Sequence, residues 1–193
     1  MASEILYSPQ APVRWAHLIT ARPQLDEAKP RAWSVELMLT NADPAHAKFL
    51  VRLEQAFVDT HGTVRRRSDK GLPWKPDKEN PTTHTVVKMK ATEFLRDDGS
   101  RAAGPKVIDS KKALWDGSAI GNGSQMIFAF TCYGWERPEG VGLSLQLKAC
   151  QVVEFVPLQV ADGIDGFAEQ DGYSVASSTP AGDEFDEFSE APF

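Results

Sequence analysis

Residues 125–135 read QMIFAFTCYGW and predict a β-strand with one face in a hydrophobic core. The large apolar side chains fall at every second position, namely Met126, Phe128, Phe130 and Cys132. Alternate side chains of a strand point to opposite faces of its sheet. Tyr133 and Trp135 are therefore expected on the other face, away from the core.

Similar patterns predict strands elsewhere in the chain, at residues 13–19, 33–39, 85–95 and 143–155. In the stretch 85–95, Val87 and Met89 are expected to face the core, which places Lys88 and Lys90 on the opposite face. Leucines alternate at the start of the last strand, and Lys148 falls opposite to them.

One helix is predicted, with Asp43 as its N-cap, Pro44 in its first turn and Gly62 at its end. A chain with several short strands and one helix lacks the repeated helical crossovers of a parallel α/β sheet. We therefore expect a mainly β protein, an OB-fold-like five-stranded barrel with one amphipathic helix and a long basic loop. Trp15 and Trp33 are expected in the core.

The formal net charge of −6 is the average of two unlike parts. Residues 1–148 hold all 21 Lys and Arg residues against 17 Asp and Glu, whereas residues 149–193 hold ten acids and no base. Residues 160–193 also lack sustained hydrophobic periodicity, which is typical of a disordered segment. The sequence thus predicts a folded domain at residues 1–159 and a disordered acidic tail at residues 160–193.

Several classes of protein are disfavoured by composition. The apolar run 126–130 is far shorter than the roughly 18 to 20 residues that span a bilayer, and the N-terminal residues lack a secretory leader, so an intracellular protein is expected. Two cysteines, Cys132 and Cys150, are too few for a disulfide framework, and both are interpreted as reduced packing residues. The four histidines show no metal-ligand spacing, so neither a metal nor a cofactor is expected.

Bases are concentrated between residues 61 and 112, where thirteen Lys and Arg stand against seven acids. Neutralising phosphates supplies most of the sequence-independent affinity for nucleic acid. The alternative is a solvated basic loop. The cations predicted to contact nucleic acid are Arg65, Arg66, Arg67, Lys70, Lys75, Lys88, Lys90, Lys106, Lys111 and Lys112, together with Lys148.

Aromatic residues lie among these bases and favour nucleic acid, because unpaired bases stack on exposed rings. Trp74 lies inside the basic loop, and Trp115 follows two consecutive lysines. With Tyr133 and Trp135 they are the four predicted stacking rings, although burial in the core is the competing interpretation for each.

The sequence provides little for catalysis, and no catalytic residue is proposed. Gly121-Asn122-Gly123-Ser124 lacks the Lys-Ser/Thr of a phosphate-binding loop and is interpreted as a turn. Asp97, Asp98 and Asp109 could in principle hold a metal for nuclease chemistry, and His61 and His84 with the two cysteines could form a dispersed zinc site. Two alternatives to DNA binding stay open: an RNA-binding or protein-interaction OB module, and a metal-dependent nuclease.

The last eleven residues, DEFDEFSEAPF, combine five acids with three phenylalanines. Acids can compete with DNA for basic side chains, and aromatic rings can dock on a partner protein. The residues predicted to act in this way are Asp183, Glu184, Phe185, Asp186, Glu187, Phe188, Glu190 and Phe193.

Three segments together resemble the replication single-stranded DNA-binding proteins of short-tailed, podovirus-type bacteriophages. They are GNGSQMIFAFTCYGW at residues 121–135, GVGLSLQLKACQVVEF at residues 140–155, and the acidic ending DEFDEFSEAPF. The early strand, the helix and the basic loop also follow in the order of that family, so the resemblance covers nearly the whole chain.

The resemblance implies an OB fold that binds single-stranded DNA without sequence preference, with roles in DNA replication, recombination and repair. It also implies strand annealing, a homodimer, and a tail that contacts the phage DNA polymerase and helicase-primase. The cytoplasm of the infected bacterial host is the location that follows. The basic loop does not align residue by residue with the family, so its assignment to DNA contact depends on charge and aromatic content alone.

Overall fold

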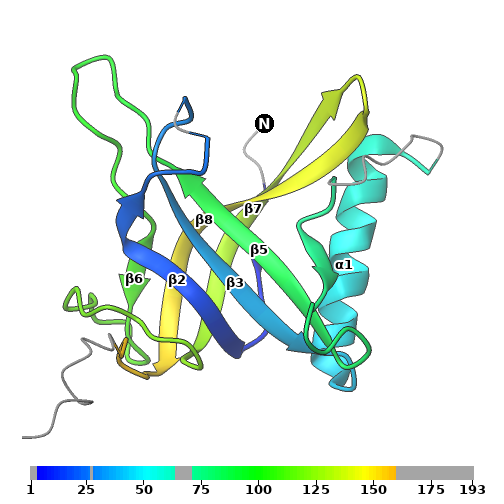
Figure 1. Cartoon of the computed structure of the whole chain (residues 1–193), viewed down its shortest axis with the longest axis horizontal. Helices are drawn as coiled ribbons and strands as arrows, with labels where there is room; N and C mark the ends of the chain where they lie inside the picture. The colour runs from blue at the N-terminus through cyan, green and yellow to red at the C-terminus, as the bar shows by residue number, and fades with distance from the viewer. Residues whose placement is uncertain (1–3, 27, 64–70, 160–193) are drawn as a thin grey trace, which may run out of the picture. The chain divides into compact units, whose positions relative to one another are not determined.

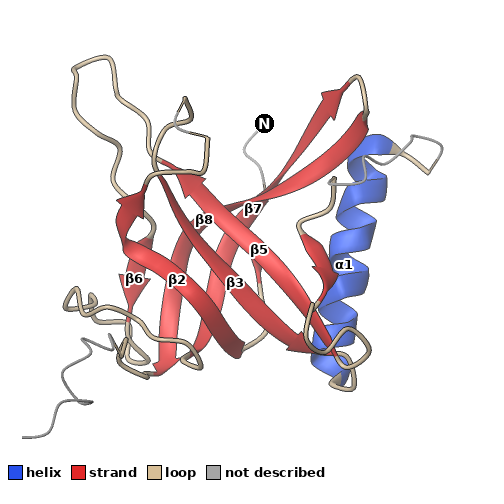
Figure 2. Cartoon of the chain, in the orientation of Figure 1, coloured by secondary structure: helices blue, strands red, loops and turns tan. Residues whose placement is uncertain are grey.

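The computed structural model describes residues 4–26, 28–63 and 71–159. Strands are the main regular structure of the described residues, and the single described helix lies along one side (Figure 2). The elements, in chain order, are β1 (Leu6–Tyr7), β2 (Ala11–Arg22), β3 (Ala32–Thr40), α1 (Pro44–His61), β4 (Trp74–Pro76), β5 (His84–Thr92), β6 (Lys106–Ile108), β7 (Gln125–Arg137) and β8 (Gly140–Glu154).

Five of the described strands pair in a closed ring. β2 pairs with β3, β3 with β5, β5 with β8, β8 with β7, and β7 again with β2. Only the β5–β8 pairing in this ring is parallel. The short strands β1, β4 and β6 pair with β7, β5 and β8, respectively (Figure 1). The prediction of a mainly β fold with one helix is confirmed.

The core of this ring contains the alternating side chains that the sequence indicates. Met126, Phe128 and Phe130 are fully buried, as are Val87 and Met89 of β5. The leucines of β8 are also buried, and Lys148 is exposed opposite to them. In the β7–β8 pair, Ala129 faces Ala149 whereas Phe130 faces Leu147, so β8 carries one extra residue at this point. This bulge brings Cys150, rather than Ala149, into the core.

The helix begins and ends where its capping residues predict. The Asp43 carboxylate accepts a hydrogen bond from the Ala45 N–H at 2.7 Å, and Gly62 follows the last turn with φ of 73°. Phe49 projects from α1 and packs edge-on against Phe130 of β7, with ring centroids 5.9 Å apart. The helix therefore covers part of the core. Among the described residues, no helix is long and apolar enough to span a membrane.

Two sequence-based expectations about elements are wrong. The basic loop around Trp74 was expected to lack regular structure, but β4 lies within it and pairs with β5. Trp15 was expected in the core, and it is 60% exposed. The reason is a register shift in β2 between Arg14 and His17, where Trp15 takes the left-handed φ of 53° and turns outward. Trp33 is buried as expected.

Candidate nucleic-acid interface

Two hollows join on the outer surface of β5, β7 and β8. The first has a volume of about 250 Å³ and the second about 360 Å³, and they share Lys90, Ser144 and Leu145. We call the two together the central groove. Its lining residues are Leu72, Pro73, Lys75, Lys88, Lys90, Thr92, Tyr133, Trp135, Leu143, Ser144, Leu145 and Gln146.

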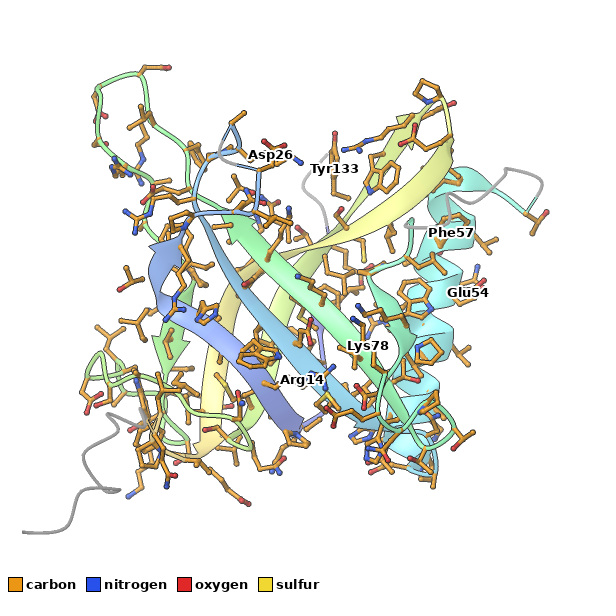
Figure 3. The ribbon with its side chains drawn as sticks, in the orientation of Figure 1. Arg14, Asp26, Glu54, Phe57, Lys78 and Tyr133 are labelled. Carbon is orange, nitrogen blue, oxygen red and sulfur yellow. The ribbon has the colours of Figure 1, made fainter. Side chains whose placement is uncertain are left out.

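A third hollow, of about 450 Å³, adjoins the central groove because both are lined by Lys75. We call it the Trp15 hollow. Its lining residues are Arg14, Trp15, Glu36, Lys75, Lys78, Glu79 and Asn122. Figure 3 shows Tyr133 toward the upper end of the sheet, and Arg14 and Lys78 toward the lower end.

The alternation of β5 places the lysines of the central groove. Val87 and Met89 point into the core, so Lys88 and Lys90 point out. Lys90 lies opposite Ser34 of β3 on one side and Gln146 of β8 on the other, and Lys88 lies opposite Glu36. The prediction that these two lysines share the outer face is confirmed.

Positive charge in the central groove is crowded. The pKa of Lys90 lies below its usual value of 10.5, because partial burial disfavours the ammonium ion and because Lys88, Lys29 and Arg137 repel it. These four cations come from the β2–β3 loop, β5 and β7. Within the described part of the chain, neither Lys88 nor Lys90 forms an ion pair with a carboxylate. An anion that entered the groove would relieve this repulsion.

Aromatic rings of β7 border the same groove. Tyr133 is 65% exposed, and Trp135 is half-buried. The Arg137 guanidinium lies 5.0 Å from the centroid of a Trp135 ring. Trp135 also packs directly over Gly142 of β8, where a Cβ atom would overlap its ring. Tyr133 thus offers an open ring beside the lysines, whereas Trp135 is braced by its neighbours.

The other two predicted stacking rings are packed against the core. Trp74 is partly buried in β4, opposite Val87 of β5. Trp115 is also partly buried, its Nε1–H donates to the Ser118 carbonyl at 2.9 Å, and its ring meets Phe155 edge-on at 5.0 Å. Neither ring lines the central groove. DNA contact by these two residues stays a prediction.

The remaining predicted cations are spread around the groove. The Lys148 ammonium donates to Gln146 Oε1 at 3.1 Å, so Lys148 borders the central groove without lining it. Lys106 is exposed on β6, and Lys111 and Lys112 lie in the turn after it, where the Asp109 carboxylate accepts from the Lys111 N–H at 2.8 Å. Arg65, Arg66, Arg67 and Lys70 lie outside the described residues, as do all the predicted tail residues.

An ion-pair network lies at the Trp15 hollow, which Arg14 and Glu36 line. Arg14 Nε lies 2.9 Å from Glu36 Oε2, and Arg14 Nη2 lies 2.8 Å from Asp77 Oδ1. Burial opposes ionisation of Asp77, but hydrogen bonds from the Asn80 N–H and the Arg14 guanidinium outweigh it, so the pKa of Asp77 falls below its usual value. The network ties the segment after β4 to β2.

Residues considered for catalysis or metal binding have structural partners. The Asp98 carboxylate accepts from the Ser100 N–H at 2.8 Å within a turn. His61 Nε2 lies 2.9 Å from the Gly142 carbonyl oxygen. Both cysteines are free, and burial raises the pKa of the Cys150 thiol to about 12. Among the described residues, no three His, Cys, Asp or Glu side chains are grouped so that they could hold a metal ion.

Several residues at the interface were missed from the sequence, Arg14 and Lys78 of the Trp15 hollow among them. The others include Trp15 and Asn122 of the same hollow, and Lys29 and Arg137, whose charges act on Lys90. The bulge that exposes Trp15 cannot be recognised from the pattern of residues in a single sequence. Asn122 could have been noticed, because an asparagine between two glycines suggests a turn with an exposed side chain.

The described fold is similar to those of solved bacteriophage proteins. For gp2.5, a single-stranded DNA-binding protein encoded by bacteriophage T7, the TM-score is 0.64 at 18% identity, over 90% of this chain and 99% of that chain. For the single-stranded DNA-binding protein of bacteriophage Enc34 in complex with single-stranded DNA, it is 0.61 at 13% identity, over 80% and 89% of the two chains. No protein-family model and no curated protein sequence matches the chain. The similarity confirms the OB-like fold and, at the level of the fold, the resemblance seen in the sequence.

Proposed function

We propose that this chain binds single-stranded DNA without sequence preference. The observation that carries the proposal is the central groove, where Lys88 and Lys90 lie beside the open ring of Tyr133. Ammonium groups neutralise phosphates in any sequence, and an aromatic ring stacks on any base. The groove therefore offers both interactions that such binding needs, and neither selects a base.

The groove favours single strands over duplex for a physical reason. The faces of the bases in a duplex are already stacked on their neighbours, whereas an unpaired strand can turn a base onto a protein ring. Support also comes from the similar fold of the Enc34 protein, which was solved with single-stranded DNA.

We further propose that the chain serves phage DNA replication, recombination and repair in the cytoplasm of an infected bacterium. In this proposal the tail residues Asp183 to Phe193 compete with DNA for the basic face. The same residues recruit the phage DNA polymerase and the helicase-primase, the chain forms a homodimer, and it acts by binding rather than by catalysis. The acids of the tail support its competition with DNA, and its phenylalanines support the recruitment of partner proteins.

Fluorescence titration with labelled oligo(dT), competed by duplex DNA and by an RNA strand of equal length, tests the proposed function. We expect oligo(dT) to be retained against an equal concentration of duplex. Preferential release by duplex would contradict single-strand binding. Stronger competition by RNA would favour the alternative, an RNA-binding module.

The nuclease alternative has its own experiment. Labelled oligo(dT) and duplex are incubated with the full chain and either Mg²⁺ or Mn²⁺, and products are separated by size. We expect intact strands at all times. Shortened products that vanish on Asp109→Asn substitution would overturn the non-catalytic assignment.

A further inference from the structure

Trp15 occupies an unusual place in β2. Arg14 pairs with Glu36 and His17 with Ser34, so one extra residue is accommodated between these two pairs. Trp15 takes φ of 53° there, a left-handed conformation that is strained for a residue with a bulky side chain. Strained backbone that persists in a fold is concentrated at functional sites. Without the bulge, strand alternation would place Trp15 on the same face as the buried Val13. With the bulge, its indole ring is 60% exposed.

The conformation of Trp15 is held by the turn before β7. The Trp15 N–H donates to Asn122 Oδ1 at 2.9 Å. The turn is itself fixed to β2, because Gly123 N donates to the Val13 carbonyl at 2.8 Å and Val13 N donates to the Ser124 carbonyl at 3.0 Å. Because these hydrogen bonds already fix the backbone at Trp15, its ring loses little conformational entropy when a ligand binds.

The Trp15 hollow offers two lysines to a phosphate, beside the carboxylate of Glu79, which lines the same hollow. Arg14 is paired with two carboxylates, those of Glu36 and Asp77, so its positive charge is already neutralised inside the protein. Lys75 and Lys78 are both exposed at the same hollow, and Lys75 also lines the central groove. A strand whose phosphates follow these lysines would pass from Tyr133 to Trp15.

We propose that the Trp15 hollow is a separate subsite for one unpaired nucleobase, which stacks on the Trp15 ring while Lys75 holds a neighbouring phosphate. Asn122 acts as a positioning residue, because its side chain fixes the backbone that presents the ring. This inference depends on the proposed function, single-stranded DNA binding, and adds where the strand leaves the central groove.

The first test compares Trp15→Ala, Trp15→Phe and Phe94→Ala in titrations with oligo(dT). Phe94 is as exposed as Trp15, at 60%, and lines neither the central groove nor the Trp15 hollow. We expect about a tenfold loss of affinity for Trp15→Ala, a small loss for Trp15→Phe, and none for Phe94→Ala. Equal affinities for wild type and Trp15→Ala would overturn the subsite.

A fully abasic strand of the same length separates stacking from a structural role. It keeps the phosphates and offers no base, so Trp15→Ala should bind it as wild type does. Asn122→Ala should weaken oligo(dT) binding in the wild-type background and change nothing in the Trp15→Ala background. An equal loss for Trp15→Ala on both strands would show that the ring acts through the fold, which contradicts the proposal. If wild-type protein binds neither strand, the proposed function itself fails.

Discussion

The lowered pKa of Lys90 predicts how DNA binding in the central groove depends on pH. Partial burial, together with repulsion from Lys88, Lys29 and Arg137, disfavours the charged form in the free protein and lowers the pKa of Lys90. A bound phosphate reverses this effect, because an anion near the ammonium favours the charged form. DNA affinity should then fall as pH rises through the pKa of Lys90. Because this pKa lies below the usual lysine value of 10.5, the fall should begin below that pH.

The pH dependence of oligo(dT) affinity, measured at constant ionic strength, checks this prediction. Lys90→Arg is the informative control, because the guanidinium stays charged across the range and still neutralises phosphate. The substituted protein should keep its affinity at the alkaline pH where wild type loses it. The same decline in both proteins would contradict a role for Lys90 in binding.

Asp77 predicts an effect on stability rather than on binding. Its folded-state pKa lies below the usual 3.8, so its carboxylate stabilises the fold above that value. The contribution is lost as pH falls through the folded-state pKa. Asp77→Asn should lower the melting temperature near neutral pH and flatten its decline in acid. Glu154→Gln, at an exposed position at the end of β8, is the matched control and should follow wild type.

At the scale of elements, the β7–β8 hairpin depends on Gly142. A Cβ at this position would overlap the Trp135 ring and lie 2.6 Å from the Gly71 carbonyl oxygen. This distance is shorter than a non-bonded contact between carbon and oxygen allows. Gly142→Ala should therefore cost about 1 to 3 kcal/mol of unfolding free energy and displace Trp135. Chemical denaturation measures the first effect. Pro138→Ala, at the exposed tip of the hairpin, should be close to neutral, and equal stability of both variants would refute the packing argument.

Much of this element structure follows from local rules. The alternation of Val87 and Met89 with two lysines predicts both a strand and its outer face, since a strand has a period of two. Asp43 and Gly62 mark the helix because they satisfy its terminal backbone groups. These features depend only on residues close together in the chain, so a single sequence is enough to predict them.

Other features depend on partners far along the chain. The outward turn of Trp15 requires the bulge in β2 and the side chain of Asn122, 107 residues away. β4 is short and contains Pro76, so its pairing with β5 leaves little trace in the sequence. The crowding around Lys90 likewise joins three elements. Cations can be listed from a sequence, but which of them converge is decided by the fold.

For the whole molecule, the proposed competition between tail and DNA gives a prediction about truncation. Removing residues 183–193 takes away five acids, so oligo(dT) affinity should rise, most clearly at low salt where charge is least screened. Association with the phage DNA polymerase should be lost at the same time. Unchanged affinity would contradict competition by the tail.

A substituted tail separates its two proposed roles. Replacing Phe185, Phe188 and Phe193 by alanine keeps all five acids of the segment. This variant should bind DNA as the full chain does while its association with the polymerase weakens. Pull-down with the purified polymerase, beside the DNA titration, distinguishes the roles, and retained association would assign recruitment to the acids alone.

The central claim is that phosphates of single-stranded DNA lie against Lys88 and Lys90. The most direct measurement is the salt dependence of oligo(dT) affinity for wild type and for a Lys88→Ala, Lys90→Ala double variant. Each phosphate neutralised on a single strand contributes about 0.7 to the slope of log affinity against log salt concentration. The double variant should bind more weakly, with a slope reduced by about 1.4. An unchanged slope and affinity, or salt-independent binding by wild type, would contradict the account.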